Sequence, residues 1–253
     1  MKSNPFNLES QWAIVTGANT GLGQSMAIAL AESGANIVLV GRSSCADTAR
    51  EIARIGSKSY EINIDLSQQD SLSNLIDESL EQAGRLDILV NNAGIIRRND
   101  ALEFSETDWD DVLDVNLKSV FFLSQAFAKN AVKNGHAAKI VNIASLLSYQ
   151  GGIRVASYTA SKSGVKGLTK LMANEWSGNN INVNAIAPGY FATNNTAALQ
   201  ADDQRNKEIL GRIPAGRWGE PNDLGGAVVF LSSSASDYVT GITLPVDGGW
   251  LAR

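Results

Sequence analysis

The chain of 253 residues is poor in the residue types that bind metals and form disulfides. It contains one cysteine, Cys45, and one histidine, His136. A single cysteine cannot form a disulfide within its own chain, and one cysteine with one histidine is too few for a zinc cluster. The sequence therefore argues against a disulfide-stabilised scaffold and against a protein-bound metal.

The chain also lacks a surplus of positive charge and a long apolar run. Its 21 Lys and Arg residues are outnumbered by 26 Asp and Glu residues, which gives a formal net charge of -5. A surface that binds nucleic acid or an anionic membrane normally carries excess positive charge, so we expect neither partner. No stretch approaches the ~20 apolar residues of a membrane span, and residues 1–7 lack the apolar centre of a signal peptide. We therefore expect a cytoplasmic protein.

Length and apolar content are typical of one α/β domain. Hydrophobic residues make up 44% of the chain and charged residues 19%, and a chain of this length can bury one sizeable core. Apolar runs alternate with helical patterns, without repeats or linkers, so we expect a single domain over residues 1–253 with a doubly wound parallel sheet. The predicted strands lie near residues 11–16, 36–41, 59–64, 86–91, 138–144, 180–186 and 241–246.

The first predicted strand leads directly into a glycine-rich turn. Trp12-Ala13-Ile14-Val15 is followed by Thr16-Gly17-Ala18-Asn19-Thr20-Gly21-Leu22-Gly23 and then by a helical pattern. Glycines permit a tight turn and a close approach of a pyrophosphate, and a helix N-terminus supplies N–H groups and partial positive charge. A glycine-rich turn is often only a turn. Its position at the first strand–helix junction nevertheless predicts a dinucleotide site in a Rossmann-like, seven-stranded fold.

A second motif is typical of proton transfer. Tyr158 and Lys162 are four positions apart, so on a helix they share one face. A free tyrosine titrates near ~10 and a nearby ammonium favours the phenolate, so we expect Lys162 to lower the pKa of Tyr158. Such a pair alone is more often a packed ring beside a solvated lysine. Ser145, which ends a predicted strand, and the glycine-rich turn favour the catalytic interpretation.

Together these motifs resemble those of the short-chain dehydrogenase/reductase family, from about residue 8 onward. Asn91-Asn92-Ala93-Gly94 and Pro188-Gly189 each follow a predicted strand, and Asn116 lies in a predicted helix. The resemblance implies an oxidoreductase that transfers a hydride between a nicotinamide and a CH–OH group. It also implies a mobile lid over the substrate at about residues 190–213.

The resemblance assigns roles to four catalytic residues. Tyr158 would exchange a proton with the substrate oxygen, and Ser145 would hydrogen-bond the same oxygen. Lys162 would hold the nicotinamide ribose, and Asn116 would hold a water that relays protons from Lys162 to solvent. The alternatives are a strand-end cap for Ser145 and a satisfied helix-interior amide for Asn116.

The resemblance further implies a set of dinucleotide-binding residues. These are Gly17, Asn19, Thr20, Gly21, Leu22, Gly23, Arg42, Asp65, Leu66, Asn92, Ala93, Gly94, Tyr158, Lys162, Pro188, Gly189, Phe191 and Thr193.

The choice of cofactor depends on the end of the second predicted strand. An Asp or Glu there selects NAD, whereas an Arg can accept the 2′-phosphate of NADP. The corner reads Val40-Gly41-Arg42-Ser43, which offers an arginine and no carboxylate. These residues favour NADP(H), although Arg42 could instead stack on the adenine or point to water. Asp65 matches the position that holds the adenine, but it could be an ordinary strand-end aspartate.

The segments that line the substrate pocket in this family are polar and basic here. Arginine suits a carboxylate and amides suit hydroxyls, so a sugar acid fits better than a steroid or an acyl chain. For Arg97 and Arg154 the alternative is a surface ion pair or a subunit contact. The predicted substrate-binding residues are Arg98, Ser145, Gln150, Arg154, Tyr158 and Asn194.

Four segments are similar to those of the deoxy-sugar-acid dehydrogenases within the family, namely residues 92–98, 148–154, 192–196 and 246–253. This similarity implies interconversion of a 3-deoxy-hexulosonate with its diketo form, in the breakdown of pectin and other uronate polymers. Such enzymes usually use NAD(H) and form homotetramers, so the arginine corner departs from their pattern. The alternatives are a gluconate, glucose, acyl-carrier or alginate-derived unsaturated-uronate reductase of the same fold, and, more remotely, a non-catalytic dinucleotide sensor.

Overall fold

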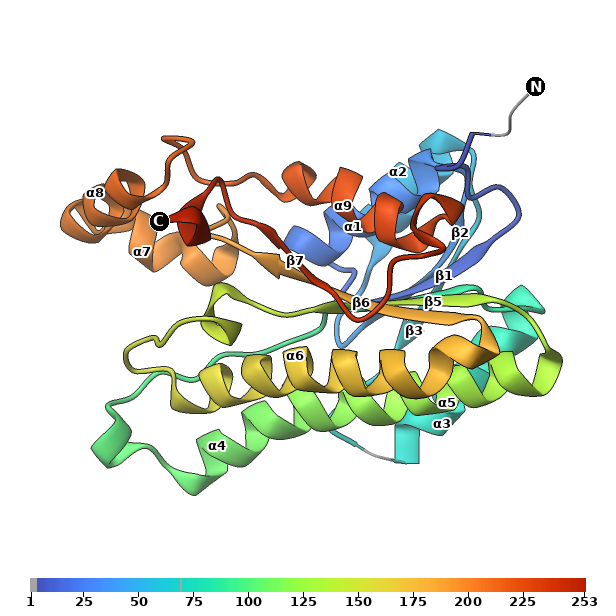
Figure 1. The fold of residues 1–253 in the computed structure, drawn as a ribbon, viewed down its shortest axis with the longest axis horizontal. Coiled ribbons are helices and arrows are strands. Elements are labelled where there is room, and N and C mark those ends of the chain that lie inside the picture. Colours follow the sequence, from blue (N-terminus) through green and yellow to red (C-terminus); the bar gives the residue numbers. More distant parts are fainter. Residues whose placement is uncertain (1–3, 69) are drawn as a thin grey trace.

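In residues 4–68 and 70–253, which the computed structural model describes, seven parallel strands form one sheet (Figure 1). Their spatial order is β3-β2-β1-β4-β5-β6-β7. The predicted seven-stranded, doubly wound fold is therefore confirmed. The strands are β1 (Trp12–Thr16), β2 (Asn36–Gly41), β3 (Ser59–Asn63), β4 (Ile88–Asn91), β5 (Ala138–Ile143), β6 (Ile181–Pro188) and β7 (Thr243–Val246).

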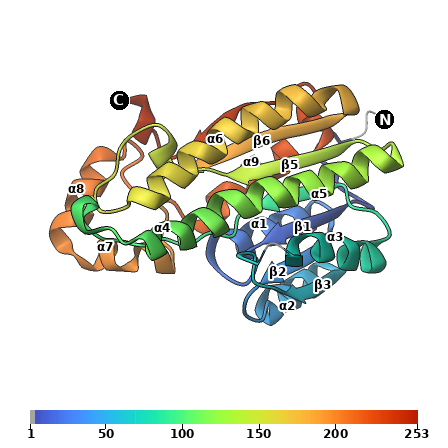
Figure 2. The ribbon, with the colours of Figure 1, turned by 90° about the horizontal axis from the view of Figure 1, so that it is seen from below.

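The strands are apolar because helices cover both faces of the sheet. On one face lie α1 (Gly21–Glu32), α2 (Ala46–Ile55) and α9 (Gly225–Ser232). The other face carries α3 (Asp70–Ala83), α5 (Ser119–Asn134) and α6 (Ala156–Trp176), as Figures 1 and 2 show. Within β1, Ala13, Ile14 and Val15 are completely buried. Alternate residues of this strand join different cores, since Ala13 and Val15 pack under α1 while Ile14 packs on the opposite face.

The order of the strands positions the functional site. The sheet grows in opposite directions from β1 and from β4, so their carboxyl ends flank the switch point where open α/β sheets bind ligands. Two short helices, α7 (Ala197–Ala201) and α8 (Asp203–Arg212), project beyond that edge together with α4 (Glu106–Leu113) (Figure 2). None of the helices in the described part of the chain is long and apolar enough to cross a membrane.

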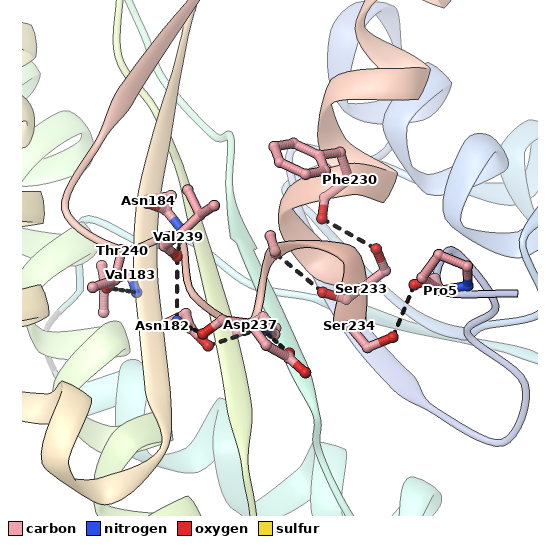
Figure 3. Close-up of polar contacts among 12 residues, drawn as sticks. Pro5, Asn182, Val183, Asn184, Phe230, Ser233, Ser234, Asp237, Val239 and Thr240 are labelled. Atoms are coloured by element: carbon pink, nitrogen blue, oxygen red, sulfur yellow. Dashed lines mark hydrogen bonds and ion pairs between the residues drawn. The ribbon is translucent and has the colours of Figure 1, made fainter. Parts of the chain in front are cut away.

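A polar cluster at the opposite edge secures the connection between α9 and β7 (Figure 3). The buried Lys139 donates to Asn182 Oδ1 at 2.8 Å and to Asp237 Oδ1 at 2.7 Å. The Asn182 amide donates to the carbonyl oxygens of Asp237 and Val239 at 3.1 and 3.2 Å. These bonds tie the loop to the starts of β5 and β6. The cluster is thus structural and lies at the edge away from the strands' carboxyl ends.

Candidate active site

A cavity of about 540 Å³ lies at the carboxyl ends of the strands and gathers most of the predicted site residues. Its walls come from both halves of the sheet and from the segment that follows β6. The predicted residues that line it are Gly17, Asn19, Thr20, Gly21, Leu22, Gly23, Arg42, Asn92, Ala93, Gly94, Arg98, Ser145, Gln150, Tyr158, Lys162, Pro188, Gly189, Thr193 and Asn194.

The glycine-rich turn brings backbone to the cavity without side-chain obstruction. Gly17 has φ +66°, and a Cβ on Gly23 would lie 2.1 Å from the Gly17 carbonyl oxygen. Asn92 closes the turn by donating to the carbonyl oxygen of Thr16 at 2.9 Å. Thr20, the N-cap of α1, makes no side-chain capping hydrogen bond. The first N–H groups of α1 are therefore available to an anion at this point.

Ser145, Tyr158 and Lys162 converge from β5 and α6. Ser145 follows β5 in an extended conformation, and its hydroxyl accepts the N–H of Leu147 at 3.2 Å. Tyr158 and Lys162 lie on the first turns of α6 and line the cavity. The Lys162 ammonium is 5.7 Å from the centre of the Tyr158 ring and donates to the Ile143 carbonyl oxygen at 2.7 Å.

Burial moves the pKa values of the two α6 side chains in opposite directions. It lowers the pKa of Lys162 to about 8, since the charged ammonium loses hydration. It raises the pKa of Tyr158, and a hydrogen bond from Ser145 and the positive charge of Arg98 partly oppose that rise. The expectation that Lys162 lowers the pKa of Tyr158 is therefore wrong. Lys162 is directed at Ile143, and Arg98 supplies the charge that acts on the phenol.

Asn116 supports the cavity wall from a π-helical turn (Asp114–Lys118) between α4 and α5. Its Oδ1 accepts the N–H of Ile95 at 2.8 Å, and its Nδ2 donates to the carbonyl oxygen of the same residue at 2.9 Å. A Cβ on Gly94 would lie 3.2 Å from Asn116 Oδ1. The amide therefore holds the segment after Gly94, and its role in a proton relay stays a prediction.

Three predicted dinucleotide residues lie outside the cavity lining: Asp65, Leu66 and Phe191. Asp65 has a lowered pKa, chiefly because it accepts the N–H of Ser67, and the charge of Arg42 adds to the lowering. Its carboxylate is thus within electrostatic reach of the cofactor corner. Leu66 and Phe191 are buried, and Phe191 packs against Gly219.

The prediction that Arg154 binds substrate is not supported, because the structure does not bring this side chain to the cavity. Its guanidinium forms an exposed ion pair with Asp100 at 3.3 Å. Arg97 likewise pairs with Asp108 and Asp111 at 3.2 and 3.0 Å, which agrees with the alternative of a surface ion pair. Closeness in sequence to Tyr158 was misleading, because Gly152, Ile153 and Val155 line the cavity while the Arg154 side chain between them pairs with Asp100.

Sequence reasoning missed the apolar wall and one charged residue of the cavity. Apolar side chains line pockets and cores alike, so their pattern in the sequence carries no signal for a site. Arg205 lies on α8 and pairs with Glu208 at 2.9 Å, which resembles any exposed helical ion pair. The missed lining residues include Ile95, Ile96, Leu146, Leu147, Ile153, Val155, Tyr190, Leu199 and Arg205.

Comparison with known proteins agrees with this geometry. The family described as enoyl-(acyl carrier protein) reductase matches residues 17–251. The chain is 60% identical over 248 residues to the 2-dehydro-3-deoxy-D-gluconate 5-dehydrogenase of Escherichia coli (strain K12), and the match covers 98% of each chain.

Two crystal structures share the fold over nearly their whole length. One is described as a 2-deoxy-D-gluconate 3-dehydrogenase from Agrobacterium tumefaciens with bound NADP. It is 59% identical with a TM-score of 0.93, over 99% of this chain and 100% of that chain. The other is described as an NAD(P)-dependent gluconate 5-dehydrogenase from Beutenbergia cavernae with bound NADP. It is 47% identical with a TM-score of 0.95, again over 99% of this chain and 100% of that chain.

Proposed function

This chain belongs to the short-chain dehydrogenase/reductase family, and from that premise we propose that it acts as an NAD(P)-dependent 2-dehydro-3-deoxy-D-gluconate 5-dehydrogenase. One observation carries the proposal. Ser145, Tyr158 and Lys162 share a single cavity with the glycine-rich turn before α1 and with the cationic Arg98. A proton donor, a dinucleotide site and a charge suited to a carboxylate thus adjoin one another.

The reaction interconverts the C5 alcohol of the deoxy-sugar acid with a C5 ketone. A bound nicotinamide would accept the hydride from C5 in the oxidation and supply it in the reduction. In the oxidation the phenolate form of Tyr158 accepts the proton of the C5 hydroxyl, and in the reduction its phenol form donates a proton to the ketone oxygen. Ser145 hydrogen-bonds the same oxygen and thereby stabilises the charge that develops there. The raised pKa of Tyr158 keeps the phenol protonated near neutral pH, which is the form that donates in the reduction.

The residues present fit a dinucleotide. The uncapped N–H groups at the start of α1 suit the pyrophosphate, and Gly23 lets α1 pack so closely on Gly17 that a Cβ there would clash with the Gly17 carbonyl oxygen. Arg42 lines the cavity at the end of β2, where NAD-selective sites carry a carboxylate. Asn19 donates to the Ser43 hydroxyl at 2.9 Å and so orders that corner. We infer that Arg42 binds the 2′-phosphate and that the enzyme accepts NADP(H) as well as NAD(H).

Arg98 is the arginine that we assign to the substrate carboxylate. It lines the cavity, and its charge reaches Tyr158, whereas Arg97 and Arg154 do not line the cavity and form exposed ion pairs. A guanidinium recognises a carboxylate through paired hydrogen bonds. Asn194, on the segment before α7, adds an amide suited to a hydroxyl. This division of roles favours an acidic sugar over a neutral one.

A turnover panel tests the proposal with 2-dehydro-3-deoxy-D-gluconate, D-gluconate and D-glucose, each with NAD and with NADP. We expect the highest kcat/KM for the deoxy-sugar acid. A higher value for D-gluconate would favour a gluconate 5-dehydrogenase, the activity named for the relative from Beutenbergia cavernae. Equal turnover of D-glucose would contradict recognition of the carboxylate by Arg98.

We also propose a homotetramer that works in the cytoplasm, with residues 190–213 as the substrate lid. Support for the assembly comes from Trp109, Val132 and Leu171, which are exposed apolar residues on α4, α5 and α6. Solvent-facing apolar residues on neighbouring helices suit a subunit contact. Support for the lid comes from Thr193, Asn194 and Leu199, since this segment contributes them to the cavity wall.

A further inference from the structure

We propose that Gln150 donates a hydrogen bond from its side-chain amide to the substrate, and that Trp250 and Arg212 are positioning residues that hold the amide in that orientation. This inference rests on the proposed function, because it identifies a determinant of sugar-acid binding at the same cavity. It concerns three segments that are distant in sequence and meet at the cavity edge.

The orientation of the Gln150 amide follows from the chemistry of its two partners. Its Oε1 accepts the indole N–H of Trp250 at 3.0 Å and a guanidinium N–H of Arg212 at 3.3 Å. An indole and a guanidinium have only donors, so the amide atom that faces them must be the oxygen. A flipped amide would set donors against donors. The amide nitrogen is therefore directed away from both partners.

That nitrogen is the group left for a ligand. Gln150 lines the cavity together with Arg98, Ser145 and Tyr158. Among the residues that the structure describes, the Gln150 amide nitrogen has no hydrogen-bond partner. Two N–H donors at the wall of the cavity suit an oxygen acceptor, and the carboxylate and 2-keto oxygens of the sugar acid are such acceptors. Gln150 thus adds a neutral donor to the cationic Arg98.

The indole that holds Gln150 is itself rigidly supported. Trp250 is only 4% exposed, and the centre of its ring is 4.7 Å from the ring centre of Tyr190. The guanidinium carbon of Arg212 lies 4.1 Å from the centre of the Trp250 ring. Asp247 fixes the turn that carries it by accepting the N–H groups of Gly249 and Leu251 at 2.8 and 2.9 Å. An immobilised donor orients its acceptor at little further entropic cost.

The same segment also holds the end of α8, from which Arg212 comes. Arg253 donates to the carbonyl oxygens of Gly211 and Arg212 at 2.8 and 3.2 Å, and Figure 1 shows the C-terminal residues beside α8. A cation at a helix C-terminus satisfies the last carbonyls and complements the helix dipole. Both donors to Gln150 are therefore part of one assembly, formed by residues 247–253 and α8.

The test is a double-mutant cycle on KM. Trp250→Phe keeps an aromatic ring but removes the N–H, and we expect KM for the sugar acid to rise about tenfold. We expect kcat and the KM for NADP to change less than twofold. Gln150→Glu keeps the acceptor for Trp250 but replaces the donor with an anion, so KM should rise further, by about a hundredfold. In a Gln150→Met background, Trp250→Phe should add nothing.

Trp218→Phe is the matched control, because it removes an indole N–H that donates to Asn206 on α8 at 2.7 Å and, among the described residues, forms no hydrogen bond with Gln150. Arg212→Met supplies a second variant at an exposed position, should Trp250→Phe impair folding. An unchanged KM in both Trp250→Phe and Arg212→Met overturns the inference. The inference is also overturned if Trp250→Phe raises KM by the same factor in the Gln150→Met background as in the wild type, since Trp250 would then act by packing.

A readout without turnover separates this inference from the proposed function. The indole N–H resonance of Trp250, assigned by its loss in Trp250→Phe, should shift in Gln150→Met in the free protein. If it shifts but the wild-type protein turns over no sugar acid, the proposed function fails while the support of the amide stands. If it does not shift, the hydrogen bond that the inference needs is absent in solution.

Discussion

Tyr158 and Lys162 show how one helix turn can hold two groups whose charged forms are both disfavoured. Desolvation opposes phenolate and ammonium alike, so it raises the first pKa and lowers the second. Ser145 and Arg98 partly restore the phenolate from outside α6. The acid–base behaviour of Tyr158 therefore depends on residues from three separate parts of the chain.

Replacing Tyr158 with Phe removes the hydroxyl and leaves the ring. We expect kcat to fall by about 10²–10⁴, the usual contribution of a general acid or base, while NADP still binds. Steady-state kinetics and quenching of protein fluorescence by NADPH measure the two properties. Tyr149→Phe is the control, since that hydroxyl donates to the Thr243 carbonyl oxygen at 3.0 Å and does not line the cavity. Undiminished turnover in Tyr158→Phe would refute its role.

The lowered pKa of Lys162 makes stability depend on pH. The pKa of Lys162 is about 8 in the folded chain and 10.5 ordinarily. Between these two pH values the unfolded chain holds the proton that the folded chain has lost. The free energy of unfolding therefore rises with pH in this window, by up to about 3 kcal/mol. We expect the free energy of unfolding of the wild type minus that of Lys162→Met, both measured by urea unfolding, to rise from pH 8 to pH 10. Lys129→Met is the control, because it shows how the loss of an exposed charge alone changes the free energy of unfolding over the same pH range. A flat or falling difference would contradict a buried, charged Lys162 below pH 8.

Among the secondary-structure elements, the interiors of the strands were predicted better than their ends. β2 has the predicted bounds, whereas β4 begins at Ile88 and not at residue 86. Asp87, just before β4, still bonds both neighbouring strands, because its N–H donates to the Trp12 carbonyl oxygen at 3.0 Å and its carbonyl oxygen accepts the Lys139 N–H at 2.9 Å. Its side chain also accepts the backbone N–H of Trp12 at 2.9 Å, a contact between residues 75 positions apart. β6 extends to Pro188, two residues beyond the predicted end, because β7 pairs with it up to Val246.

The corner at the end of β2 decides the cofactor in our proposal, and Arg42→Asp tests it. A carboxylate repels the 2′-phosphate and accepts the ribose hydroxyls, so KM for NADP should rise about a hundredfold while KM for NAD falls. The measured quantity is the ratio of kcat/KM for the two cofactors. Arg50→Asp on α2 makes the same charge change at an exposed ion pair with Asp47 and should leave the ratio unaltered. An unaltered ratio in Arg42→Asp would exclude Arg42 from the phosphate site.

At the scale of the whole molecule, helices cover both faces of the described sheet, yet apolar residues stay exposed on α4, α5 and α6. We expect light scattering to give four times the chain mass. Trp109→Glu and Leu171→Glu place charges on the exposed apolar surface and should dissociate the assembly, because an unpaired charge is costly to bury in an interface. Tyr238→Glu, at a fully exposed position in the loop before β7, is the control. A monomeric wild type would contradict the proposed tetramer.

The sequence by itself determined the features that depend on near neighbours along the chain. The turn from Gly17 to Gly23, the four-residue spacing of Tyr158 and Lys162, and the apolar strand runs are all set within one or two turns of backbone. Such patterns predicted the sheet, the glycine-rich turn and the pair of α6 residues that we propose as catalytic. They need no knowledge of what packs against them.

Only the tertiary structure decided which polar side chains face the cavity and how they are oriented. It selected Arg98 over Arg154, directed Lys162 to Ile143, and set the Gln150 amide through Trp250, 100 positions away. The physical reason is that a side chain's direction and protonation depend on the donors, charges and solvent that folding brings to it. No local periodicity encodes those partners.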